Sequence, residues 1–386
     1  MRTADVLVIG AGVIGASIAY HLAKKGIRKI IVIDKSDIPG SGSTSKATGG
    51  FRAQFGSEIN IKLSLLSGNK LKSFKDETGI DPEIKQNGYL FIANNDNKLQ
   101  ILRSALELQH NCGLTEAEEV TAEDISRLNP YIKPDGIVGG AFCSTDGFIS
   151  PMQILKGYTD IAKSLGVKFE YGAELTGFTK TPDSIGEVLT STDKISVGSV
   201  VNAAGAWAGK IAGLAGCEIP VTPLKRQVAV VKEEKILPDN IPMTIFAEDS
   251  FHFRMRDNKL ILLLPEEPVS RDIYNTNPED IWMEKVFAIA QDRIPSLNKC
   301  NLDKQNSWAG LYEMSPDEHV LLGKASGFEN FFLANGSSGH GVMHSPAIGE
   351  LLSEIIVDGK ASTLDVNSLN PSRFAEGKPI KSINIF

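Results

Sequence analysis

The chain has 386 residues, of which 42% are hydrophobic and 23% charged, and it carries a formal net charge of −7. This length is typical of about two domains, and this composition is typical of a globular protein rather than a disordered one. The modest negative charge, with both signs interspersed, argues against nucleic-acid binding, which favours a basic stripe. The four cysteines are scattered without a C-x-x-C pair, so we expect no disulfide framework, no metal site and a reducing, cytoplasmic location.

The first elements predicted are a strand, a glycine turn, a helix and a second strand. Residues 5–9 form a continuous apolar run, as in a parallel strand buried on both faces, and a G-x-G-x-x-G turn follows at 10–15. Small and apolar residues then recur at helical spacing as far as Gly26. Residues 29–33 form a second apolar run, which ends at Asp34.

The three glycines and the acid have separate tasks in a dinucleotide site. Gly10 permits the tight turn, Gly12 lets the backbone approach a pyrophosphate, and Gly15 lets the helix pack close to the sheet. The helix N-terminus offers N–H groups and partial positive charge to phosphates, and Asp34 can accept hydrogen bonds from ribose hydroxyls. Because these parts occur in order, a dinucleotide site is favoured over a purely structural glycine turn.

The acid alone does not decide between FAD and NAD, but the next segment helps. Residues 39–55, PGSGSTSKATGGFRAQF, are rich in Gly, Ser and Thr and predict a loop or a short helix start. Such a segment supplies backbone N–H groups and hydroxyls for a second pass over a pyrophosphate and a flavin. The alternative is a flexible surface loop.

Further strands are predicted along the rest of the chain from apolar runs and alternation, at 88–93, 199–202, 221–231, 250–255, 259–264 and 330–334. The strand at 199–202 runs into a turn of small residues. The strand at 330–334 runs into the glycine-rich turn NGSSGHGVM and a helical pattern through Ile356. This second strand-to-helix turn favours FAD, because a helix N-terminus stabilises the negative charge of a reduced flavin.

Five segments resemble the FAD-dependent family of D-amino acid oxidase, glycine oxidase, sarcosine oxidase and dimethylglycine dehydrogenase: DVLVIGAGVIGASIAYHLAKKG, GSGSTSKATGGFRAQFG, VVNAAGAWA, SWAGLYEMSPDEHVLLG and GSSGHGVMHSPAIGELLSEII. The last two look like the β subunits of archaeal dye-linked L-proline dehydrogenase and heterotetrameric sarcosine oxidase. The resemblance covers nearly the whole chain. It implies an α/β fold with a doubly wound, Rossmann-type FAD-binding domain and an α+β substrate domain built on an antiparallel sheet.

We place the FAD-binding domain at 1–80, 145–215 and 307–386, and the substrate or cap domain at 81–144 and 216–306. The predicted cofactor is FAD, bound without a covalent link. The residues expected to contact it lie in or beside the glycine-rich and small-residue turns: Gly10, Gly12, Val13, Ile14, Gly15, Asp34, Lys35, Ser43, Thr44, Ser45, Gly49, Gly50, Phe51, Leu175, Ala204, Gly205, Trp207, Gly310, Gly339, His340, Gly341, Val342 and Met343.

The resemblance implies hydride transfer from the carbon beside a substrate nitrogen to flavin N5, giving an imine that hydrolyses in water. The cofactor carries the hard chemistry, so no strong general base is required. An amino-acid carboxylate needs a cation, best a bidentate arginine. Arg52 matches the arginine that grips the carboxylate in monomeric sarcosine oxidase; the alternative is contact with FAD phosphates or solvent.

Three further residues complete the predicted catalytic set. His252 and Arg254 lie at strand spacing, so both point to one face, where they could bind the amine and the carboxylate. Arg256 shares that parity, which keeps open the alternative of a solvated basic edge. His340, in the second glycine turn, has a family counterpart near the pyrimidine end of the flavin; the alternative is a plain turn residue.

Three places depart from the pattern of the family's oxidases. Gly310 stands where monomeric sarcosine oxidase attaches its flavin through a cysteine, so dissociable FAD is expected. Met343 stands where that enzyme has a lysine that helps to hold the carboxylate, which gives the two arginines more weight. Residues 260–264 are apolar where the oxidases carry an O₂-activating lysine, and Lys259 lies only at the start of this strand. Because a cation stabilises charge developing on O₂, a dehydrogenase that passes electrons to a dye, quinone or partner subunit is favoured.

The predicted function is therefore FAD-dependent oxidation of a small amino acid or secondary amine, such as proline, sarcosine or glycine. The open alternatives are a peroxide-producing amino-acid oxidase, a 2-hydroxy-acid dehydrogenase and a non-catalytic flavoprotein that serves in assembly. No transmembrane segment is expected, because the most apolar stretch, residues 6–20, is too short to span a bilayer. His21 and His110 are expected to be exposed on helices.

Overall fold

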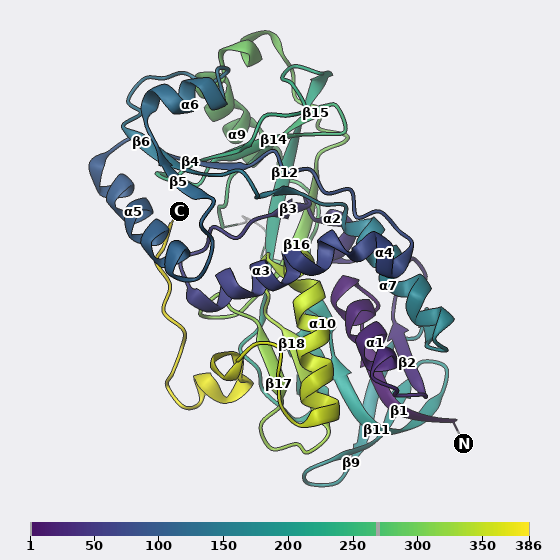
Figure 1. Ribbon diagram of the computed structural model, residues 1–386. Coiled ribbons are helices and arrows are strands. Elements are labelled where there is room, and N and C mark those ends of the chain that lie inside the picture. Colours follow the sequence, from purple (N-terminus) through teal and green to yellow (C-terminus); the bar gives the residue numbers. More distant parts are fainter. Residues whose placement is uncertain (1, 268–270, 386) are drawn as a thin grey trace.

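The computed structural model describes residues 2–267 and 271–385. A largely parallel sheet carries the first glycine turn (Figure 1). Its strands lie in the order β17 (Leu321–Lys324), β18 (Phe331–Asn335), β11 (Lys194–Asn202), β1 (Arg2–Ile9), β2 (Ile30–Asp34) and β8 (Lys168–Tyr171), and β10 (Ile185–Thr190) joins β9 (Leu175–Lys180) to β11. The strands from β18 to β8 are parallel, whereas β17, β9 and β10 pair antiparallel.

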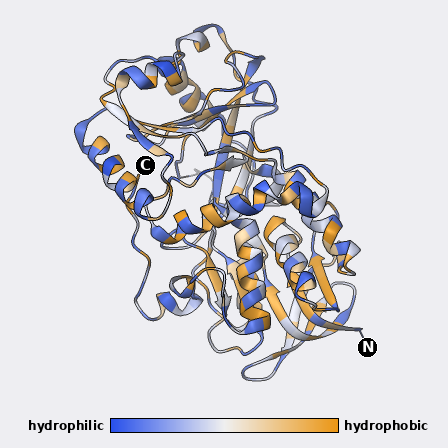
Figure 2. Ribbon diagram, in the orientation of Figure 1, coloured by the Kyte–Doolittle hydropathy of each residue, from blue (hydrophilic) through white to orange (hydrophobic). Residues whose placement is uncertain are grey.

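Both faces of this sheet are covered, as its apolar strands require. Val6 and Val8 of β1 belong to the core under α1 (Val13–Lys24), which packs between α10 (Gly341–Asp358) and α7 (Pro151–Ser164). Leu7 and Ile9 belong to the opposite core, which contains α8 (Ala208–Ala215) and residues of β9 and β10. Figure 2 shows the hydrophobic colouring of the strands behind α1. The doubly wound arrangement is therefore confirmed for this sheet.

The packing of α1 corrects one expectation about exposure. His21 is buried at 5% exposure, because α1 has helices on two sides, and its Nδ1 lies 2.8 Å from the carbonyl oxygen of Ser17. Burial lowers the pKa of His21 to about 4, so the ring is neutral at pH 7. His110 is exposed, as expected.

The second sheet is antiparallel except for one pair. Its order is β16 (Trp308–Met314), β12 (Thr222–Glu234), β15 (Lys259–Leu263), β14 (His252–Arg256), β13 (Met243–Phe246), β4 (Tyr89–Ala93), β6 (Gly139–Cys143) and β5 (Ala117–Val120), and only β13 and β4 run parallel among these neighbours in the described chain. One face packs on α6 (Ala122–Leu128) and α9 (Asp280–Arg293). β16 lies in this sheet although the sequence reasoning placed residues 307–386 with the FAD-binding domain; the domain boundaries themselves stay a prediction.

The other elements of the described residues are α2 (Ser43–Lys46), β3 (Gly50–Phe51), α3 (Glu58–Lys72), α4 (Phe74–Thr78), α5 (Asp96–Asn111), β7 (Gly147–Phe148), and the 3₁₀ helices η1 (Gly205–Trp207), η2 (Pro295–Lys299), η3 (Asn367–Leu369) and η4 (Pro371–Phe374). α3 packs against α10 (Figure 1). Within residues 2–267 and 271–385, no helix has both the length and the apolar character needed to cross a membrane.

Candidate active site

A cavity of about 860 Å³ is lined by residues of both sheets. On one side its wall is formed where parallel strands end, at Gly10 after β1, Asp34 at the end of β2, Ala203 after β11 and Ser337 after β18. Such carboxyl ends are where ligands bind in doubly wound sheets. On the other side the wall includes Tyr89 of β4 and other residues of the second sheet.

The first glycine turn has the tight geometry that the sequence motif predicts. Gly10 has a φ of +106°, and a Cβ there would lie 2.3 Å from the carbonyl oxygen of Ala203. A Cβ on Gly15 would lie 1.9 Å from the Gly10 oxygen, so only glycine lets α1 approach β1 this closely. Asp34 Oδ2 accepts a hydrogen bond of 2.8 Å from the N–H of Ala11, which fixes the acid beside the turn.

Most of the predicted cofactor residues line the cavity: Gly10, Gly12, Val13, Ile14, Asp34, Lys35, Ser43, Thr44, Gly49, Gly50, Leu175, Ala204, Gly205, Trp207, Gly310, Gly339, His340, Gly341, Val342 and Met343. The three that are not part of the wall are Gly15, Ser45 and Phe51. Gly15 acts from beneath, by letting the helix pack. Contact of each residue with the cofactor stays a prediction.

The segment at 39–55 is an anchored wall of the cavity and not a free surface loop. Its Thr44 hydroxyl accepts a 3.2 Å hydrogen bond from the N–H of Val13 in the first turn of α1. Ser43 donates a 2.6 Å bond to the Leu311 carbonyl of β16. This one stretch of chain therefore contacts both α1, which covers the first sheet, and β16 of the second sheet.

Arg254 supports this segment from outside the cavity wall. Phe253 and Met255 belong to the core beneath α9, so His252, Arg254 and Arg256 share the opposite face of β14. Arg254 is 7% exposed, donates a 2.9 Å hydrogen bond to the Thr48 carbonyl and has its guanidinium carbon 3.5 Å from the centre of the Phe148 ring. Its predicted role in carboxylate binding gains no support from this position.

Arg52 is the predicted arginine that lines the cavity. It is 6% exposed, donates to the Gln54 carbonyl and lies 3.8 Å above the ring of Phe55. Burial lowers its pKa to about 10, which still leaves the guanidinium charged at neutral pH. Asp146 fixes the backbone here by accepting bonds of 2.7 Å from Ala53 N–H and 3.1 Å from the Gln54 amide.

The histidines near this arginine are neutral. His252 and His340 line the cavity, and the His340 ring meets Phe55 edge-on at 4.7 Å between centres. Burial lowers the pKa of His252 to about 4 and that of His340 well below its ordinary value. His344, beside them, has its pKa lowered to about 3 by burial and bonds to Ser64 Oγ at 2.9 Å. Beside these neutral histidine rings, the positive charge is therefore carried by Arg52.

Sequence reasoning missed a buried polar group behind the second glycine turn. Glu313 Oε2, Ser337 Oγ and both amide atoms of Asn335 are buried without a hydrogen-bond partner in the protein. Glu313 and Ser337 line the cavity, and burial raises the pKa of Glu313 to about 7. Buried polar atoms normally have partners, so Glu313 and Ser337 in the cavity wall offer hydrogen-bonding groups to a ligand. In the sequence, the one feature that could have indicated this buried polar group is the carboxylate of Glu313 within an apolar strand.

These observations fit FAD. The cradle at Gly10 and Gly12, with Asp34 beside it, suits an ADP moiety, and a Cβ on Gly12 would crowd the Thr44 hydroxyl at 3.2 Å. The unpartnered groups around Glu313 suit a polyol chain or a ring with amide groups. The helix α10 begins at Gly341 in the cavity wall, where its N-terminus favours negative charge.

Comparison with known proteins agrees with this fit. The family model described as FAD dependent oxidoreductase (DAO) matches residues 5–355. The chain is 30% identical to FAD-dependent oxidoreductase domain-containing protein 1 of Xenopus laevis, covering 99% of this chain and 85% of that protein. It is 27% identical to mitochondrial dimethylglycine dehydrogenase of Rattus norvegicus, covering 97% of this chain but only 45% of that protein. The crystal structure of L-proline dehydrogenase from P. horikoshii superimposes with a TM-score of 0.90 at 29% identity, covering 98% and 100% of the two chains. The chain therefore belongs to the FAD dependent oxidoreductase (DAO) family, and FAD is its cofactor.

Proposed function

We propose that this enzyme oxidises a small amino acid or secondary amine whose carboxylate is bound by Arg52. The carrying observation is a charged, buried arginine in the wall of the cavity, among neutral histidines. A carboxylate taken out of water needs a cation, and a guanidinium can hold both of its oxygens. The alternative that Arg52 faces solvent loses support, because the side chain is buried.

The surroundings of Arg52 suit a compact aliphatic substrate. Phe55, Tyr89, Met243 and Ile245 line the same cavity and offer apolar surface. His252 Nδ1 lies 2.7 Å from the Ser250 carbonyl, so the hydrogen sits on Nδ1 and leaves Nε2 as an acceptor. We assign His252 Nε2 to the substrate's amino group, as an acceptor of one of its hydrogens.

When bound, FAD supplies the electron acceptor for the carbon–nitrogen oxidation. The chain's own residues bind the carboxylate, orient the amine and exclude water. The similar proteins named L-proline dehydrogenase and dimethylglycine dehydrogenase support an amino acid with a substituted nitrogen as the substrate. A 2-hydroxy acid would present the same carboxylate to Arg52 and is the second candidate.

We further propose a dehydrogenase rather than an oxidase. Leu263 and Leu264 line the cavity, whereas Lys259 is not part of its wall. The Lys259 ammonium donates to the Lys232 carbonyl and lies 3.6 Å from a Glu234 oxygen, outside the site. This apolar strand end offers no cation to O₂, which favours an organic acceptor or a partner subunit.

Anaerobic mixing of the FAD-loaded enzyme with candidate substrates tests the proposal. Proline, sarcosine, glycine, D-amino acids and 2-hydroxy acids are added separately, and loss of the oxidised flavin absorbance is followed. We expect bleaching by a secondary amino acid. Bleaching by 2-hydroxy acids alone would replace the amine proposal with the second candidate. Re-oxidation of the bleached enzyme as fast by O₂ as by an artificial dye would refute the dehydrogenase assignment.

A further inference from the structure

The last described residues form a strap, residues 378–385, that reaches the cavity. In Figure 1 this yellow segment leaves η4 beside the first sheet and runs along the edge of the molecule towards the second. It contains no helix or strand, and residues 381, 382 and 384 are exposed. Nevertheless Ile380, Ser382, Ile383, Asn384 and Ile385 all line the cavity that contains Arg52.

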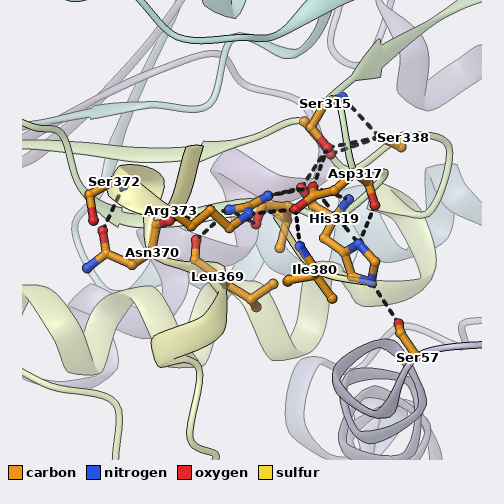
Figure 3. Close-up of polar contacts among 12 residues, drawn as sticks. Ser57, Ser315, Asp317, His319, Ser338, Leu369, Asn370, Ser372, Arg373 and Ile380 are labelled. Carbon is orange, nitrogen blue, oxygen red and sulfur yellow. Dashed lines mark hydrogen bonds and ion pairs between the residues drawn. The ribbon is translucent and has the colours of Figure 1, made fainter. Parts of the chain in front are cut away.

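The near end of the strap is fixed by a buried ion pair. Arg373 donates bonds of 2.8 and 2.9 Å to the two carboxylate oxygens of Asp317, and both side chains are 3% exposed (Figure 3). The same carboxylate accepts a 3.0 Å bond from the N–H of Ile380. Because a buried, bidentate pair has little freedom to move, it fixes the point at which the strap begins to cross the cavity.

The turn that carries Asp317 is tied to the cofactor side as well. The N–H of Ser315 donates a 3.1 Å bond to the Ser338 hydroxyl of the second glycine turn. His319 Nε2 lies 2.7 Å from the hydroxyl of Ser57, which precedes α3 (Figure 3). The position of the start of the strap is therefore fixed relative to the second glycine turn.

The far end of the strap is bonded to the stretch of chain that carries Arg52. The N–H of Ile383 donates a 2.8 Å bond to the carbonyl of Gly56, and a Cβ on Gly56 would lie 1.9 Å from the Ile383 oxygen. Gly56 follows Phe55, whose ring is 3.8 Å from the Arg52 guanidinium carbon. Ile385 is buried at 6% exposure within the core that also contains Phe55.

We propose that the strap is the wall that limits substrate size, with Ile383 and Ile385 as specificity-determining residues. The inference rests on the proposed function, because it needs Arg52 to hold the carboxylate. A substrate held there extends along a cavity whose wall includes the two isoleucines. Enlarging that space should admit bulkier substrates, because a hydrophobic pocket discriminates by the volume left for each added carbon.

The test measures binding of three carboxylates of rising size to the FAD-loaded enzyme: acetate, pyrrole-2-carboxylate and indole-2-carboxylate. Binding is read from the perturbed flavin absorbance, so no turnover is required. Ile383→Ala and Ile385→Ala enlarge the space, and Gly56→Ala displaces the strap backbone. Gly213→Ala in α8 is the matched control, because its added Cβ meets no atom within 4 Å. A chain that ends at Pro379 removes the wall altogether.

We expect the ratio of the indole-2-carboxylate Kd to the acetate Kd to fall by about tenfold in Ile383→Ala and to stay unchanged in Gly213→Ala. An unchanged ratio in Ile383→Ala, Ile385→Ala and Gly56→Ala alike would overturn the inference while leaving the proposed function intact. A wild-type enzyme that binds none of the three carboxylates would overturn both. If the shortened chain does not retain FAD, the three point variants decide the question.

Discussion

Replacing Arg52 by methionine is the sharpest test of the carboxylate site. The guanidinium is buried, charged at neutral pH and part of the cavity wall. Removing one partner of a buried, hydrogen-bonded charge pair costs about 2–5 kcal/mol. At about 1.36 kcal/mol for each factor of ten, this predicts a loss of about 30-fold to 5,000-fold in carboxylate affinity and in kcat/KM. Arg52→Lys keeps the charge but loses the planar fork, so its carboxylate affinity should lie between those of the wild type and Arg52→Met.

Arg254 provides a matched control for this experiment. It is buried to nearly the same extent as Arg52, at 7% against 6% exposure, and each guanidinium lies over a phenylalanine ring, at 3.5 and 3.8 Å. It differs in being outside the cavity wall, with a bond to the Thr48 carbonyl. Arg254→Met should therefore weaken the anchoring of the 39–55 segment, and with it FAD retention, more than substrate binding.

The assay is the Kd of acetate and of the best substrate analogue, measured on enzyme saturated with FAD, together with kcat/KM. Saturation separates a loss of substrate binding from a loss of cofactor. An Arg52→Met variant with wild-type carboxylate affinity would refute the assignment of Arg52. If Arg254→Met lost more carboxylate affinity than Arg52→Met, with FAD retained in both variants, the carboxylate site would be assigned to Arg254.

Three further outcomes follow from the geometry. Gly10→Ala places a Cβ 2.3 Å from the Ala203 oxygen at a φ of +106°, so FAD affinity and Tm should both fall; dye-binding and cofactor-release curves measure this. FAD should separate from the chain on acid denaturation, because Gly310 has no side chain to form a bond; flavin that elutes with unfolded protein would contradict it. In the FAD-free protein, the contribution of Glu313 to the free energy of unfolding should decrease as pH rises from 4.5 to about 7, because the unfolded carboxyl ionises while the buried one stays protonated. The buried neutral histidines contribute with the opposite sign over this range. The quantity to measure is therefore the free energy of unfolding of the wild type minus that of Glu313→Gln, from urea titrations at a series of pH values, and this difference should fall as pH rises.

The cofactor half of the fold is the part that local sequence predicts well. The strand at β1, the turn at Gly10 and the helix α1 are adjacent in the chain, so each constrains the next within a few residues. The exposure of His21 was predicted wrongly, because it does not depend on neighbouring residues in the chain. Its burial depends on α7 and α10, which are distant in sequence and cover two sides of α1.

The substrate half depends on contacts that local patterns do not contain. Parity along β14 correctly places His252 and Arg254 on one face, but it does not say that the 39–55 segment lies across Arg254. Glu313 is an isolated carboxylate in an apolar strand, and its burial, with the Ser337 N–H of the second glycine turn bonded to it, is a tertiary feature that the local pattern does not contain. Residues 378–385 carry no periodic pattern, so their place in the cavity wall follows from tertiary contacts, at Asp317 for Ile380 and at Gly56 for Ile383.

The 39–55 segment links the cofactor and substrate ends of the site mechanically. Near its start Thr44 accepts from the first turn of α1, and near its end Arg52 lines the cavity. Arg254 and Arg256 of the second sheet donate to the carbonyls of Thr48 and Ala47 between these points. A change in the second sheet that loosens either arginine therefore acts on both ends, so cofactor affinity should fall and substrate affinity should fall with it to a smaller extent. A variant in the Asp317–Arg373 anchor acts on the strap instead and should alter substrate preference first.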